Sequence, residues 1–192
     1  MKVYRPLTFE EHFRVGSLYE AKGLHEKALL AYAHAQKIRP DDSSIYFGLG
    51  NVKLNLNKLA EAEKNYLKAI ELDQEVGIYY NNLAWTYIQM GLLDVAKMNL
   101  NIGMGWDPDR RYIYLDTLGV IEEKMENYDE AERHFKEAAL VIPLEEVSGL
   151  IEVYTHLRNL YLLTGRGREA GEVDESLMEL LEDARAIKKS VE

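Results

Sequence analysis

Small residues recur along this chain at an almost constant interval, and this recurrence restricts the fold more than any other feature of the sequence. Ala28, Ala62 and Ala96 follow one another at intervals of 34 residues, Ala131 comes 35 later, and Ala170 comes 39 after that. A second small column lies twelve positions ahead of the first four alanines and consists of Gly16, Gly50, Ala84 and Gly119. A fixed period of roughly 20–50 residues is typical of proteins that stack similar structural units side by side.

Each period contains two amphipathic stretches in which apolar residues recur three and four positions apart, the spacing of one face of an α-helix. In four of the periods, a residue that tolerates the left-handed conformation of a helix end lies between the two stretches. These residues are Gly23, Asn57, Gly91 and Gly165. Pro40, Pro108 and Pro143 end three of the second stretches, because proline cannot continue a helical ladder. No segment alternates long enough to predict a strand, so we expect an all-α chain.

The columns resemble the tetratricopeptide repeat (TPR), whose unit reads W-x2-L-G-x2-Y, then A-x3-F, then P. In the first unit the matching residues are His12, Val15, Gly16, Tyr19, Ala28, Tyr32, Ala35 and Pro40. After an N-terminal extension at 1–8, four units in register occupy 9–42, 43–76, 77–111 and 112–143. Residues 144–192 hold a degenerate fifth unit and a long C-terminal capping helix. The resemblance implies a right-handed superhelical solenoid of about five helix–turn–helix repeats.

The 13 tyrosines of the chain are largely explained by this pattern, because eight of them fall in the aromatic columns of the repeat. The large columns of stacked repeats fill the space between helices at interior density. We therefore expect these eight side chains in or beside the core rather than around a ligand. They are Tyr19, Tyr32, Tyr46, Tyr66, Tyr80, Tyr87, Tyr154 and Tyr161.

The last helix, expected at about residues 168–189, carries a narrow apolar seam in alternating steps of three and four. The seam consists of Ala170, Val173, Leu177, Leu180, Ala184, Ile187 and Val191. We interpret its first half as a cap that packs on the preceding helix, since solenoids need a terminal helix with a polar outer face. The alternative is that the part beyond Leu181 pairs with a second molecule, as a coiled-coil seam does.

Composition excludes several functional classes. With 23 Lys+Arg against 33 Asp+Glu, the formal net charge is −10, which disfavours binding to nucleic acid or to an anionic membrane surface. There is no cysteine, and no run of about 18 apolar residues predicts a membrane span. The first residues lack the apolar core of a signal peptide. We expect a cytoplasmic protein, or a periplasmic one if an export signal has been removed.

No catalytic, metal or cofactor motif is present. The five histidines share no common spacing, and H-E-x-x-H does not occur. The stretch from Gly165 to Arg168 is rich in glycine and arginine, but it follows a predicted helix rather than a strand, so we interpret it as a turn. We therefore expect no enzyme activity, no cofactor and no metal site.

The resemblance implies a concave groove lined by the first helix of each repeat, where partner peptides lie. Asparagine and glutamine amides there can hold a peptide backbone, and rigid aromatic rings supply binding hot spots. The positions that face this groove in the family correspond to Phe13, Ser17, Phe47, Asn51, Asn55, Asn81, Trp85, Gln89, Asp116, Val120, Lys124, Thr155 and Asn159. Among these we single out Asn51, Asn81 and Trp85.

The predicted function is a non-enzymatic adaptor or scaffold that binds a peptide or segment of a partner protein in its groove. The alternative is a structural protein that assembles with itself into a homo-oligomer. Chaperone-binding TPR proteins grip a terminal carboxylate with lysine, arginine and asparagine. The corresponding positions here are Phe13, Ser17, Gly48, Ile78 and Asn82, which supply no cation, so we do not expect such carboxylate tails as partners.

Overall fold

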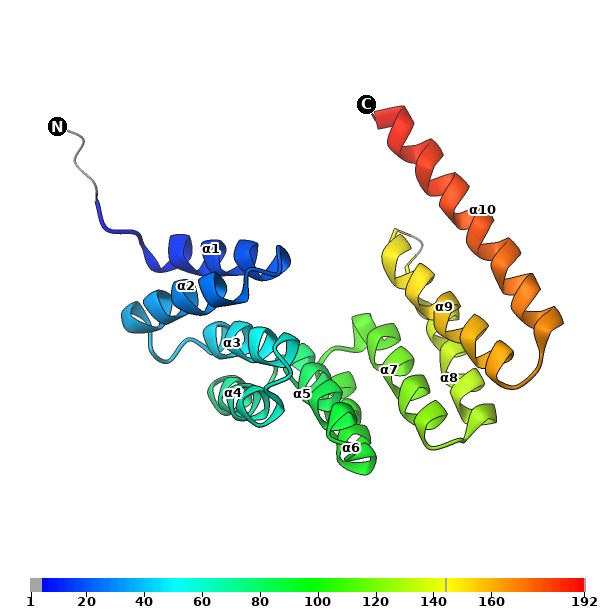
Figure 1. Ribbon diagram of the computed structural model, residues 1–192, viewed down its shortest axis with the longest axis horizontal. Helices are drawn as coiled ribbons and strands as arrows, with labels where there is room; N and C mark the ends of the chain where they lie inside the picture. Colours follow the sequence, from blue (N-terminus) through cyan, green and yellow to red (C-terminus); the bar gives the residue numbers. More distant parts are fainter. Residues whose placement is uncertain (1–4, 144, 192) are drawn as a thin grey trace. The chain divides into compact units, whose positions relative to one another are not determined.

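The computed structural model describes residues 5–143 and 145–191, and side chains as far as Glu182. Within these ranges the chain forms ten α-helices and one short 3₁₀ helix, and no strand, as the repeat pattern predicts (Figure 1). The helices are α1 (Phe9–Ala21), α2 (His25–Ile38), α3 (Ser43–Asn55), α4 (Leu59–Leu72), α5 (Gly77–Gln89), α6 (Leu93–Trp106), η1 (Pro108–Arg110), α7 (Arg111–Lys124), α8 (Tyr128–Val141), α9 (Val147–Leu163) and α10 (Gly167–Val191).

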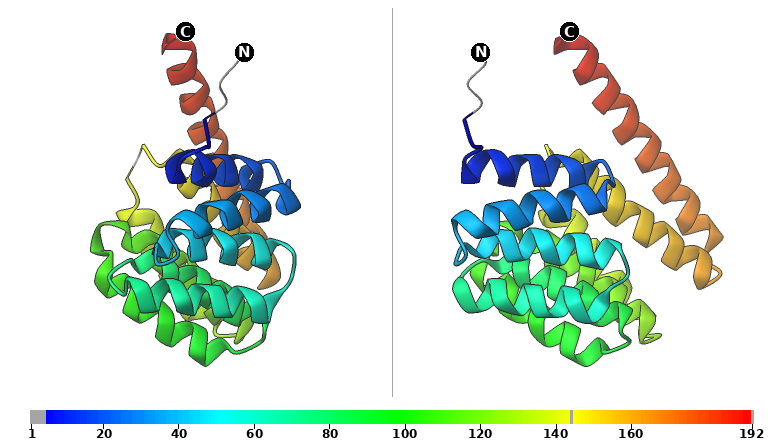
Figure 2. Two further views of the ribbon diagram at one scale, coloured as in Figure 1. Left: turned by 90° about the vertical axis from the view of Figure 1, so that its left-hand side faces the viewer. Right: turned by 60° about the vertical axis from the view of Figure 1, so that its left-hand side comes forward.

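Consecutive helices pack as antiparallel pairs, one pair for each predicted repeat. The chain divides into an N-terminal half, residues 1–106 with α1 to α6, and a C-terminal half, residues 107–192 with α7 to α10. In the N-terminal half each pair contacts the next, and the first helices α1, α3 and α5 are also neighbours (Figure 2). In the C-terminal half α8 packs on α9, and the first helices α7 and α9 touch. Each half thus has its own row of adjacent first helices.

The turns inside the repeats use left-handed backbone, as predicted for four of them. Gly23, Asn57, Gly91 and Gly165 have φ angles of 68°, 56°, 76° and 75°. The fourth repeat reaches the same conformation with Glu126, at a φ of 63°. A glutamate is strained at positive φ, and the asparagine of this turn, Asn127, lies one position after the left-handed residue.

Glycines on the first helices let an aromatic ring of the second helix reach the groove side. The ring of Tyr32 lies between Gly16 of α1 and Gly48 of α3, and its side chain is 1 % exposed. A Cβ atom added at Gly16 or Gly48 would approach that ring to 2.7 or 2.6 Å, which is shorter than any normal contact. The two glycines therefore leave the space that the large Tyr32 ring occupies between the helices.

The eight repeat-column tyrosines lie in or beside the core, as predicted. Five are buried: Tyr32, Tyr66, Tyr80, Tyr87 and Tyr161. Tyr19, Tyr46 and Tyr154 are half-buried. No tyrosine of this set is left without packing, so none of the eight needs a ligand to explain it.

The first half of α10 caps the C-terminal half of the chain. Ala170 and Val173 are buried in one core cluster with Leu157 and Tyr161, and Leu177 and Leu180 pack against that cluster. With 25 residues, α10 is longer than the 17-residue α9 on which it packs. Ala184, Ile187 and Val191, which would form the dimer seam, lie outside the residues whose side chains the structure describes.

Candidate functional site

Five of the predicted groove residues line one pocket in the N-terminal half. The pocket has a volume of about 390 Å³ and lies between α1 and α3. The predicted residues are Phe13, Ser17, Phe47, Asn51 and Asn55, and the pocket is completed by Glu20, Ala21, Tyr32 and Gly48. We refer to it as the α1–α3 pocket.

Helical spacing brings these side chains to one side. Phe13, Ser17 and Glu20 occupy successive turns of one face of α1. Phe47, Asn51 and Asn55 do the same on α3. Gly48 has no side chain, and the Tyr32 ring occupies the space that a side chain there would need, so this ring forms part of the pocket wall. The pocket is therefore a direct product of the repeat columns.

The hydroxyl of Tyr32 organises the polar end of the pocket. It donates to Oε2 of Glu20 at 2.7 Å, and the hydroxyl of Ser17 lies 3.2 Å away. Burial of the ring raises the pKa of Tyr32, and the neighbouring Glu20 carboxylate raises it as well. Tyr32 is therefore a neutral donor that holds Glu20 against the pocket wall.

Asn51 is held in one orientation by two donors. Its Oδ1 accepts a hydrogen bond from the Tyr66 hydroxyl at 2.8 Å and another from Nδ2 of Asn82 at 2.9 Å. Burial raises the pKa of Tyr66, so this hydroxyl keeps its proton. With the oxygen engaged, the amide N–H groups are what Asn51 can offer to a ligand, and these would recognise a carbonyl oxygen.

The two phenylalanines of the pocket are fixed by ring contacts. The centroid of Phe13 lies 5.6 Å from that of Tyr32, and the centroid of Phe47 lies 4.9 Å from that of Tyr79 and 6.0 Å from that of Tyr66. Both side chains are half-buried. Their exposed parts form a rigid apolar surface that loses little conformational entropy when a ligand binds.

The remaining predicted groove residues of the N-terminal half lie on α5, and one of them is buried in the structure. Asn81 is only 4 % exposed and is not available as a groove amide, because α5 buries residues around most of its circumference. Trp85 is half-buried, and Gln89 is exposed at the end of the helix. The α1–α3 pocket does not include these three residues.

In the C-terminal half, the predicted groove residue Asp116 is also buried. Asp116 is 7 % exposed, and its Oδ1 lies 2.8 Å from Nδ1 of His156, which reaches it from α9. Burial lowers the pKa of His156, but the bond to Asp116 and the nearby carboxylates outweigh this and raise it. Asp116 therefore links two first helices through this hydrogen bond, which is an ion pair when His156 is protonated. Val120 is half-buried, whereas Lys124, Thr155 and Asn159 are exposed.

The same region holds the one group of described residues whose donor atoms lie close enough to share a metal ion. The donor atoms of Asp116, Glu152 and His156 all lie within 4.8 Å of one another. No sequence motif indicates this group, because Asp116 lies on a different helix from the other two. The ion pair between His156 and Asp116 already accounts for two of its three members.

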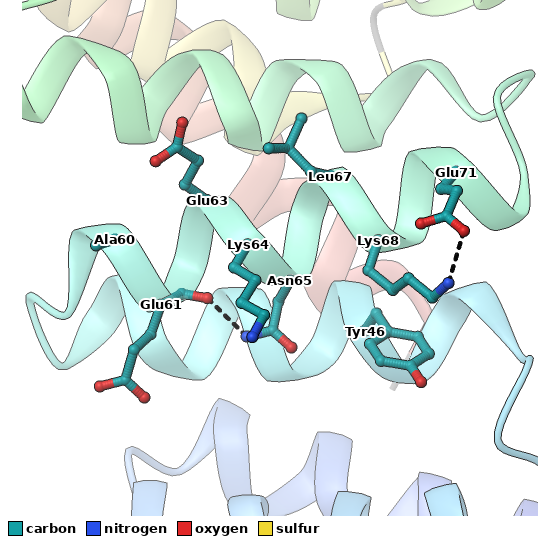
Figure 3. Close-up of a pocket in the computed structure, with 9 residues that line it drawn as sticks. All are labelled: Tyr46, Ala60, Glu61, Glu63, Lys64, Asn65, Leu67, Lys68 and Glu71. Carbon is teal, nitrogen blue, oxygen red and sulfur yellow. Dashed lines mark hydrogen bonds and ion pairs between the residues drawn. The ribbon is translucent and has the colours of Figure 1, made fainter.

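A larger pocket of about 750 Å³ lies along α4 and was not predicted. Its lining is mostly charged: Glu61, Glu63, Lys64, Lys68 and Glu71, with Tyr46 at one side (Figure 3). Figure 3 shows Lys68 turned toward Glu71, with Nζ and Oε1 2.7 Å apart. Because charges of both signs lie along this surface and partly pair with each other, it presents no consistent chemistry to a ligand.

Antiparallel helix pairs that follow one another along the chain define a helical-repeat protein of the kind that serves as a protein-interaction scaffold. The chain belongs to the tetratricopeptide repeat family, whose model matches residues 12–42, 43–76 and 78–110. It is 31 % identical over 102 residues to the human protein O-mannosyl-transferase TMTC3 and 38 % identical over 65 residues to the mouse protein. These matches cover 53 % and 34 % of this chain, but only 11 % and 7 % of the relatives.

Solved structures show the same fold. TTC0263, a thermophilic TPR protein of Thermus thermophilus, superposes with a TM-score of 0.79 at 22 % identity, covering 95 % of this chain and 98 % of that one. PilW, a type IV pilus biogenesis factor, reaches 0.79 at 15 % identity, covering 91 % and 78 %. MamA reaches 0.67 at 18 % identity, covering 96 % and 99 %. At such identities the likeness concerns the fold alone. None of the described helices is long and apolar enough to cross a bilayer.

Proposed function

We propose that this chain is a non-enzymatic adaptor that binds an extended segment of a partner protein on the first-helix face of its N-terminal half. The observation that most supports the proposal is the hydrogen bonding of the Asn51 side chain. Its oxygen is engaged by Tyr66 and Asn82, so its N–H groups are oriented before any ligand arrives. A preorganised donor beside two fixed aromatic rings suits a peptide, which offers a carbonyl at every residue.

The binding mode follows from the pocket walls. A carbonyl of the segment accepts a hydrogen bond from Asn51, and an adjoining side chain covers Phe13 and Phe47. A pocket of about 390 Å³ has room for one or two side chains rather than a folded domain. We expect the rest of the affinity to come from further contacts along the same face, including the half-buried Trp85 and the exposed Gln89.

The experiment is a peptide-display selection on the whole chain, followed by affinity measurements of the selected peptides by fluorescence anisotropy. The test variant is Asn51→Ala combined with Phe47→Ser. The control is Leu30→Ser, which changes a side chain on α2 that is 62 % exposed and does not line the pocket. We expect the test variant to lose binding and the control to retain it. If the selected peptides bind the test variant and the control with equal affinity, this face is not the binding site.

An exposed apolar row on α6 favours a second candidate, self-assembly. Val95, Met98 and Ile102 lie on one side of this helix and are 39 %, 65 % and 47 % exposed. Light scattering of the wild type and of a Met98→Glu variant tests it. An oligomer that Met98→Glu dissociates supports a self-assembling scaffold, whereas a monomer at all concentrations excludes it.

A further inference from the structure

The α1–α3 pocket has a negative end. Glu20 supplies the only charged side chain among the described residues that line it. Oε2 of Glu20 accepts from the Tyr32 hydroxyl at 2.7 Å, which fixes the carboxylate at the wall and leaves its other oxygen for a second donor. The structure thus presents a held, half-buried carboxylate rather than a mobile surface charge.

Two helix ends add to this negative potential. Ala21 and Asn55, which line the same pocket, are the last residues of α1 and α3. The carbonyl groups at a helix C-terminus carry roughly half a negative charge, which stabilises a nearby cation. These dipoles are independent of Glu20 and favour the same sign of charge.

Neighbouring lysines do not neutralise this end of the pocket. Lys53 of α3 is held by Glu61, with Nζ and Oε2 2.6 Å apart. Lys22, which follows α1, is exposed and is not among the residues that line the pocket. A positive charge is therefore what the pocket lacks.

The aromatic side chains that line the pocket also favour a cationic ligand. Phe13 and Phe47 both line the pocket, and the face of an aromatic ring attracts an ammonium or guanidinium group. The aliphatic stem of a lysine or arginine also packs well on such rings. A carboxylate or phosphate group, in contrast, would meet Glu20 and two helix C-termini with no cation to balance them.

We propose that the α1–α3 pocket binds a lysine or arginine side chain of the partner segment, with the cationic group on Glu20 and the stem between the two phenylalanines. Asn51 then holds a backbone carbonyl of the same segment. This inference rests on the proposed adaptor function and adds the chemistry of the segment that is bound. It predicts a basic residue as the anchor, which an acidic chain with a net charge of −10 also attracts at long range.

The test uses peptides selected by display on the whole chain, each compared with versions in which one basic residue is replaced by norleucine. We expect one lysine or arginine to be required, and its replacement to weaken binding about tenfold. Glu20→Gln should weaken binding of the parent peptide by a similar factor and should have little effect on the norleucine version. Tyr32→Phe removes the hydrogen bond but keeps the carboxylate, so it should retain the preference for a cation.

The outcomes separate this inference from the function on which it rests. Peptides that need Phe47 but are indifferent to Glu20 and to their own basic residues would overturn the cation pocket and leave the adaptor function intact. Peptides unaffected by changes at Asn51 and Phe47 would overturn both. Glu26→Gln, at an exposed site on α2, is the matched charge control, and thermal melting of each variant shows that it is folded.

Discussion

The hydroxyl of Tyr66 donates to Oδ1 of Asn51 across 2.8 Å and so connects the core of the second repeat to the amide that faces the α1–α3 pocket. Tyr66 is completely buried, while Asn51 lies at the boundary between core and surface. A core residue therefore determines how the amide group of a pocket-lining residue is oriented.

Removing this hydroxyl tests the relationship. Tyr66→Phe deletes one buried hydrogen bond and should lower the free energy of unfolding by about 1 kcal/mol, measured by urea denaturation. Tyr46→Phe is the control, because its hydroxyl bonds to the carbonyl of Pro40 in an exposed turn. We expect a smaller effect there, and an equal loss in the two variants would contradict the special role of Tyr66.

Gly48→Ala tests the packing of Tyr32. Gly105→Ala is its control, and the expected change in stability has the opposite sign. Gly48→Ala places a methyl group 2.6 Å from the buried ring and should destabilise the chain by about 1–3 kcal/mol. Gly105→Ala, in the exposed part of α6 with no neighbour within 4 Å, should stabilise it by about 0.5–1 kcal/mol. Thermal or urea unfolding measures both, and a Gly48→Ala variant as stable as wild type would show that Tyr32 can move aside.

The left-handed Glu126 offers a stabilising substitution. At its φ of 63°, a side chain is strained, whereas glycine adopts this conformation freely. Glu126→Gly should therefore raise the free energy of unfolding by about 0.5–1 kcal/mol. Gly91→Ala, at a φ of 76°, is the converse control and should lower it. Urea denaturation checks both signs.

The pH dependence of stability should follow Glu132 of α8, which bonds to Tyr161 of α9 and to Arg166 in the turn that precedes α10. Burial raises the pKa of this carboxyl, but hydrogen bonds from Arg166, Lys136 and Tyr161 outweigh it and lower the pKa from 4.5 to about 2. The stabilisation is therefore complete above about pH 5 and is lost as the pH falls toward 2.

Urea unfolding of wild type and Glu132→Gln across this range measures the contribution. At neutral pH we expect the wild type to be more stable by on the order of 2 kcal/mol, allowing for the partial exposure of Arg166 and Lys136. The difference should shrink as the pH falls below 4. A constant difference down to the acid limit would show that the carboxylate charge is not what stabilises the wild type.

The helix order and the core tyrosines follow from the sequence because they depend on short-range periodicity. The columns predict that Tyr32 is buried, and the structure shows Gly16 and Gly48 making room for it. The left-handed Glu126 was missed because only glycine and asparagine signal that conformation reliably.

The site was predicted less completely. Five of the residues selected by repeat position line one pocket, namely Phe13, Ser17, Phe47, Asn51 and Asn55, and peptide binding there stays a prediction. The repeat positions also select Asn81 and Asp116, which are buried, because a repeat position fixes the side of the helix and not how deeply its neighbours cover it. Tyr32 was expected only in the core, and its role beside Glu20 depends on a hydrogen bond between two helices.

Phe47 contributes both to the α1–α3 pocket and to the packing between the second and third repeats. It lines the α1–α3 pocket, and its ring also packs on Tyr79 at the start of α5, where the Tyr79 hydroxyl lies 3.1 Å from that of Ser43 on α3. Because Phe47 contacts α5 through Tyr79, we expect any ligand that shifts this ring to shift α5 with respect to α3 as well. If a segment binds as proposed, we expect filling of the pocket to be coupled to the angle between the second and third repeats and to restrict motion between them.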